Sequence, residues 1–110
     1  WHPIIDSNKY ANNYDYNKAV YLMSEYKILD NGFLVLKKDE SFSSPIASVF
    51  YEEYEDLEQL KLELKKEEEN IQCIVSKGLE NHHIPFGKTQ QPQLADYADN
   101  VDTMKFLTQL

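Results

Sequence analysis

A leucine-patterned acidic segment at residues 55–69, flanked by two short apolar runs, limits the possible fold more than any other feature. The buried stripe of this segment is expected from three leucines at helical spacing, Leu57, Leu60 and Leu64. The flanking runs, residues 46–51 and 71–75, are rich in residue types that favour strands. A strand, a helix and a strand in this order predict a compact βαβ unit, which usually closes a parallel pair with a right-handed crossover.

The first third of the chain predicts a loop followed by a helix. Residues 7–14 are rich in Asn, Ser and Tyr, a composition typical of loops. From Asp15, which with Asn13 is one of two possible N-caps, apolar residues recur at i, i+3, i+4 and i+7. This spacing predicts one buried stripe, made of Tyr16, Ala19, Val20 and Met23. The helix is expected to end before Asp30-Asn31-Gly32, because Asn and Gly tolerate the positive φ of a tight turn.

A further strand and a last helix complete the predicted order. Residues 33–36 are apolar and predict a buried strand, whereas residues 37–45 contain three serines and predict an exposed connection. Residues 102–110 predict a short helix capped by Asp102. Together these elements predict an α/β module that occupies residues 1–110 as a single domain with one modest core.

Charge and residue usage exclude several partners. The formal net charge is −8 and the chain has no Arg, whereas phosphate binding needs clustered Lys and Arg, so we expect no nucleic-acid partner. Cys73 is the one cysteine, which suits a reducing compartment. No apolar run approaches the roughly 18 residues that cross a bilayer. Because neither a signal peptide nor an initiator Met is present, we expect a cytoplasmic protein and a segment of a longer chain.

The side chains with reactive or ligating groups are scattered along the chain. Cys73 lies among apolar residues, so we expect it to be buried in a strand; a nucleophile needs an electropositive, partly open setting. His82 and His83 are adjacent and point opposite ways on an extended chain, which favours a surface loop over a metal site. Asp39 and Glu40 fall in the polar connection, where solvated charge is the default. The residues alone predict a module without a self-contained active site.

The order of several short motifs resembles a known family. Residues 39–45 lead into a strand and an acidic helix, and Pro85-Phe86-Gly87-Lys88 follows later. In the aldehyde dehydrogenase superfamily a Glu-x-Phe-Gly-Pro motif likewise precedes a strand and a helix, and a Pro-Phe-Gly-Gly loop comes later. The closer resemblance is to bacterial acyl-CoA reductases of the LuxC type, whose smaller members carry stretches similar to residues 12–18, 29–33 and 96–103.

This resemblance implies the C-terminal part of an aldehyde dehydrogenase-like catalytic domain. The family reduces a fatty acyl-CoA to a fatty aldehyde with NADPH through a cysteine thioester, which divides the reaction into two easier steps. Carried over by motif, Glu40 would hydrogen-bond the nicotinamide ribose and Phe42 would pack beside the nicotinamide. The nucleophile and the nucleotide-binding fold are expected upstream. The isolated 110-residue chain is therefore expected to be inactive and to bind NADPH weakly at most.

Two other functions stay open. One is a freestanding protein-interaction module of the same α/β shape, without catalysis, and the other is a domain that binds a small ligand. Under the reductase interpretation the partners are the rest of the parent chain and, in the parent, a fatty acyl-CoA. Self-association is also expected through residues 33–36 and 71–75, because unpaired strand edges and uncovered apolar faces invite another copy.

Overall fold

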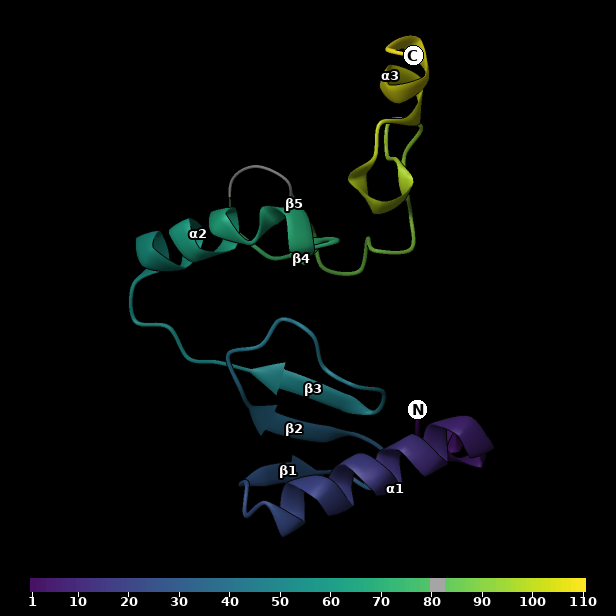
Figure 1. The fold of residues 1–110 in the computed structure, drawn as a ribbon, viewed down its shortest axis with the longest axis vertical. Coiled ribbons are helices and arrows are strands. Elements are labelled where there is room, and N and C mark those ends of the chain that lie inside the picture. The colour runs from purple at the N-terminus through teal and green to yellow at the C-terminus, as the bar shows by residue number, and fades with distance from the viewer. Residues whose placement is uncertain (80–82) are drawn as a thin grey trace. The chain divides into compact units, whose positions relative to one another are not determined.

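The computed structural model describes residues 1–79 and 83–110. By their internal contacts these residues form two compact units, Trp1–Glu55 and Asp56–Leu110, and each unit is described by itself. Helices and strands occur in both units (Figure 1). The chain is therefore a small mixed α/β protein, as its sequence predicts, while a single domain over residues 1–110 stays a prediction.

The first unit begins with helical structure. A short 3-10 helix, η1 (His2–Asp6), leads into the long helix α1 (Asn8–Met23), with Ser7 at its N-cap position. The prediction of a loop over residues 7–14 is wrong, because α1 already begins at Asn8. The many Asn and Tyr residues of this stretch favour loops on average, but their side chains here face the sheet or solvent without interrupting the helix.

The buried face of α1 also differs from the predicted one. Tyr14, Asn17 and Tyr21 are buried, whereas Tyr16 and Met23 of the predicted stripe are exposed. Apolar side chains surround this helix on all sides, so their periodicity does not select one face. Hydrogen bonds select it instead, because the side chains of Tyr14 and Asn17 donate to partners on the hairpin turn and on the chain just before the third strand.

A three-stranded sheet with the order β1-β2-β3 follows α1. β1 (Ile28–Asp30) and β2 (Val35–Lys38) form an antiparallel hairpin, and β3 (Ser48–Tyr51) lies parallel to β2 (Figure 1). The hairpin turn is the predicted one: Gly32 has a φ of +94° and donates its N–H to Asp30 Oδ1 at 2.8 Å. β1 itself was not foreseen from the sequence, and β2 begins two residues later than predicted.

The face of the sheet that meets α1 forms the core of the first unit. Val35 is fully buried and clusters with Tyr14, Tyr21 and Ala47. Beside this cluster Lys37 is only 5% exposed, so the prediction that residue 37 begins an exposed connection is wrong. The strand continues beyond the apolar run because its backbone pairs with β3 along the whole of β2.

The opposite face of the sheet carries an apolar row. Leu29, Leu36 and Val49 pair with one another across the three strands. Leu29 is 62% exposed and Val49 is 43% exposed. We call these three residues the outer apolar row, and they form an open apolar surface.

The second unit begins with helix α2 (Leu57–Lys66), the helix that the leucine spacing predicts. The predicted buried stripe is wrong, however, because no residue of α2 is buried and Leu57 is 40% exposed. Asp56 caps the helix, because its Oδ1 accepts from the Glu58 N–H at 3.0 Å. Helix α2 ends three residues before the predicted end, and the 3-10 turn η2 (Glu68–Asn70) follows it. A helix is therefore formed within the segment where the leucine spacing predicts it.

The rest of the second unit consists of short elements. β4 (Ile74–Val75) and β5 (His83–Ile84) pair in parallel. The 3-10 turn η3 (Ala98–Asn100) precedes helix α3 (Thr103–Thr108). The predicted cap of this last helix is confirmed, since Asp102 Oδ1 accepts from a backbone N–H of its first turn at 2.8 Å.

The βαβ unit predicted over residues 46–75 is not formed. Within the described residues β3 pairs with β2, and β4 pairs with β5, so β3 and β4 share no ladder. The partner of β3 lies across a short connection, residues 39–47, which costs less chain entropy to close than a crossover through α2. Helix α2 therefore does not act as the crossover of a parallel pair.

Candidate functional site

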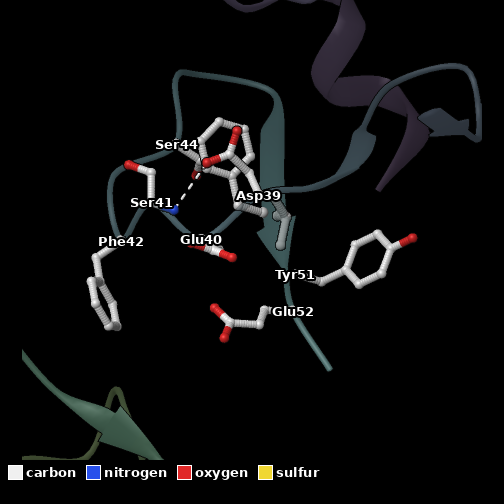
Figure 2. Close-up of a pocket in the computed structure, with 9 residues that line it drawn as sticks. Asp39, Glu40, Ser41, Phe42, Ser44, Tyr51 and Glu52 are labelled. Atoms are coloured by element: carbon white, nitrogen blue, oxygen red, sulfur yellow. Dashed lines mark hydrogen bonds between the residues drawn. The ribbon is translucent and has the colours of Figure 1, made fainter. Parts of the chain in front are cut away.

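A hollow of about 250 Å³ opens where β2 ends and the chain turns back toward β3. Both residues that the resemblance assigns to the cofactor, Glu40 and Phe42, lie in its lining (Figure 2). The full lining comes from the connection between the strands and from β3 and its end, and consists of Asp39, Glu40, Ser41, Phe42, Ser44, Val49, Phe50, Tyr51 and Glu52.

Asp39 shapes the connection that borders this hollow. Its Oδ1 accepts from the Ser41 N–H at 2.9 Å, the dashed line in Figure 2, and its own N–H donates to the Tyr51 carbonyl at 3.1 Å. A carboxylate that accepts from the backbone two residues further on forms an Asx turn. The turn contains Glu40 at its middle and leads into Phe42, so both side chains are presented from an ordered backbone.

The hollow combines carboxylates with aromatic rings. In the view of Figure 2 the carboxylates of Glu40 and Glu52 extend into the same space, and the ring of Tyr51 is turned the other way. Phe42 is 57% exposed. Such a surface accepts hydrogen bonds from hydroxyl groups and offers a ring to a planar ligand.

Lys37 compensates the charge of Asp39, the first residue of the turn. Its Nζ forms an ion pair with Asp39 Oδ2. The hydrogen bond from Lys37, followed by that from the Ser41 N–H, holds the pKa of Asp39 below its ordinary value, so this carboxyl is ionised at neutral pH. Nothing in the sequence distinguishes Lys37 from its exposed neighbour Lys38, because both lie within a run of polar residues.

Cys73 lies in the second unit and is exposed. The prediction that it is buried in a strand is wrong, because β4 comprises only Ile74–Val75 and Cys73 precedes it. It borders an open groove of about 950 Å³ that runs along α2. Exposure by itself does not make a thiol reactive, since the thiolate also needs a favourable local charge.

The remaining candidate residues also belong to the second unit. His83 is half-buried in β5 rather than placed in a surface loop, and His82 lies outside the described residues. Gly87 has a φ of +78° in a turn that is closed by the Lys88 N–H and the Pro85 carbonyl at 3.1 Å. Across residues 1–79 and 83–110, no three His, Cys, Asp or Glu side chains are grouped to hold a metal ion.

Comparison with known proteins identifies no relative of this chain. No protein-family model, no curated protein and no solved structure matches it. Among the helices that the structure describes, none combines the length and apolar character needed to span a bilayer. The fold and the site together define a small mixed α/β protein with an open hollow lined by carboxylates and aromatic rings.

Proposed function

We propose that this chain is the C-terminal part of a cytoplasmic, NADPH-dependent acyl-CoA reductase of the aldehyde dehydrogenase superfamily. The observation that supports the proposal is that Glu40 and Phe42 line one hollow and lie in the connection that leads into β3. The superfamily motif that they resemble also precedes a strand and presents its Glu and its Phe to one ligand. In the parent enzyme a cysteine upstream takes the acyl group from CoA as a thioester.

The hollow suits the nicotinamide riboside end of the cofactor. Glu40 is exposed, and its two carboxylate oxygens are able to accept from both ribose hydroxyls. Phe42 offers an exposed ring to the flat nicotinamide. A volume of about 250 Å³ holds a sugar and a ring rather than a whole dinucleotide. When bound, NADPH supplies the hydride, and the contribution of this chain is to bind and orient one end of it.

Replacing Glu40 with Gln in the full-length parent tests the proposal. Gln keeps the shape of the side chain but removes its charge, so we expect kcat/KM for NADPH to fall. The fall should correspond to a loss of transition-state stabilisation on the order of 1–3 kcal/mol. Glu53→Gln is the matched control, because Glu53 is exposed and pairs with Lys38 outside the lining of the hollow. Steady-state kinetics that are the same for wild type and Glu40→Gln would sink the assignment of Glu40.

The isolated 110-residue chain provides a second arm of the same experiment. Acyl-CoA-dependent oxidation of NADPH needs the upstream cysteine and the nucleotide-binding fold, so we expect none from the purified chain. Measurable turnover by this chain alone contradicts the assignment of the chemistry to upstream residues.

A freestanding interaction module is the second candidate, and the outer apolar row favours it. Leu29, Leu36 and Val49 form an open apolar strip on a small sheet, which is typical of a docking surface. The upstream reading frame separates the two candidates. A frame that continues upstream through a nucleotide-binding fold supports the reductase, whereas a start codon directly before Trp1 supports the module.

A further inference from the structure

Lys37 is a buried lysine whose ammonium is surrounded by aromatic rings. Its Nζ lies 4.1 Å from the ring centroid of Tyr26, 5.1 Å from that of Phe50 and 5.4 Å from that of Tyr21. The two tyrosine rings meet edge to face, with centroids 6.4 Å apart and planes at 85°. Phe50 completes the enclosure, because it lies directly across the ladder from Lys37. We call the three rings the aromatic cage, and each of them attracts the cation through its π-system.

A buried ammonium is stable only where its charge is compensated. Asp39 provides this compensation to Lys37 through Oδ2, while Oδ1 of the same carboxylate accepts from the Ser41 N–H at 2.9 Å. One carboxylate therefore joins the aromatic cage to the turn that carries Glu40 and Phe42. Lys37 is enclosed and has little freedom to move, and it holds Oδ2 of Asp39. Oδ1 is thereby kept in position to accept from the Ser41 N–H.

The adjacent lysine shows what an ordinary surface lysine does in this strand. Lys38 points to the opposite face of the sheet, its side chain is 62% exposed, and it pairs with the exposed Glu53 at 3.2 Å. An exposed pair of this kind contributes little to stability. Lys37, by contrast, is enclosed on the inner face at the point where β2 leads into the turn.

We propose that Lys37 is a positioning residue, which the aromatic cage holds in place and which, through Asp39, orders the turn that presents Glu40 and Phe42 to a ligand. The identity of that ligand, the nicotinamide riboside end of NADPH, rests on the proposed function. The ordering of the turn does not rest on it, so the two are tested by separate measurements.

Lys37→Met in the 110-residue chain tests the ordering of the turn. Met keeps an apolar stem in the cage but removes the charge that holds Asp39, so the bond from the Ser41 N–H to this carboxylate is weakened. We expect the Ser41 amide to exchange with solvent roughly tenfold faster or more, and its proton resonance to move upfield, in heteronuclear NMR spectra. Lys38→Met is the matched control, because it makes the same change at the next residue on the opposite face, and it leaves the Ser41 amide as in wild type.

A second pair of variants covers the case in which Lys37→Met fails to fold. Tyr26 is about half exposed and provides the ring nearest to Nζ. Tyr26→Leu removes this ring and is expected to change the Ser41 amide in the same direction, whereas Tyr26→Phe keeps the ring and leaves the amide unchanged. A Ser41 amide that stays as in wild type in the folded variants Lys37→Met and Tyr26→Leu overturns the positioning role.

Kinetics of the full-length parent separate this inference from the proposed function. If both hold, Lys37→Met raises KM for NADPH roughly tenfold with a smaller change in kcat, because the turn orders a binding group rather than a reacting one. A changed Ser41 amide together with an unchanged KM supports the positioning role of Lys37 and contradicts the assignment of Glu40 and Phe42 to the cofactor.

Discussion

Asp30 joins the helix of the first unit to its hairpin turn. Its Oδ1 accepts from the Tyr14 hydroxyl at 2.6 Å and from the Gly32 N–H at 2.8 Å, and its Oδ2 pairs with Lys18 Nζ at 2.5 Å. The hydrogen bond from Lys18, followed by that from Tyr14, lowers the pKa of Asp30 to about 2. The sequence indicated the turn at Asp30, but it did not indicate that Tyr14 and Lys18 of α1 are its partners.

The lowered pKa predicts how stability depends on pH. The folded pKa of about 2 lies below the ordinary value of 3.8, so the stabilisation is present above 3.8 and is lost as the pH falls through about 2. After a discount for the partial exposure of the pair, its loss costs about 1 kcal/mol. We expect Asp30→Asn to lower the free energy of unfolding by this amount at pH 7 and by much less below pH 2, measured by urea unfolding.

Asp15→Asn is the control for the Asp30 prediction. Asp15 is an exposed carboxylate on α1, and it has no ion pair among the described residues. Its replacement is expected to leave the unfolding curve nearly unchanged at both pH values. An Asp30→Asn variant with the stability of wild type at pH 7 contradicts the prediction.

At the scale of elements, signals within a few residues of one another were predictive and longer-range pairing was not. The leucine spacing that predicts α2 and the capping aspartate before α3 act within a single helix. The buried face of α1 depends on partners in the hairpin turn and before β3, which helical periodicity does not contain. The parallel pairing of β2 with β3 likewise depends on how the connection between them closes.

The cap of α2 gives a prediction at this scale. A helix of 10 residues is marginal by itself in water, so one lost capping bond has a visible effect. We expect Asp56→Ala to cost about 1 kcal/mol of helix stability and to lower the helical signal in far-UV circular dichroism. Glu55→Ala removes a neighbouring charge without removing the capping bond, and a loss of the same size in both variants would mean that charge rather than the bond stabilises the helix.

At the scale of the whole molecule, apolar surface and net charge oppose each other. The outer apolar row crosses the sheet of the first unit, and β1 and β3 are the edge strands of that sheet. Both features favour contact with another copy. The formal charge of −8 opposes association, but acidic residues are concentrated in and around α2 rather than along the sheet.

We therefore predict that the isolated chain self-associates at about 100 µM, as measured by light scattering. Val49→Lys places a charge on the outer face of the edge strand β3 and is expected to shift the chain toward monomer. Tyr16→Lys makes a comparable change at an exposed position of α1 and serves as control. A strict monomer in the wild-type chain at this concentration contradicts the prediction.

The amino-acid sequence by itself determined the features that depend on neighbouring residues. The Asp30-Asn31-Gly32 turn and the caps at Asp56 and Asp102 follow from bonds that close within two or three residues, so they form whatever lies around them. Only the tertiary structure decided the environments of Lys37 and Cys73. A lysine becomes buried where rings from α1 and β3 and a carboxylate compensate its charge, and a cysteine in an apolar run stays exposed where the strand is only two residues long.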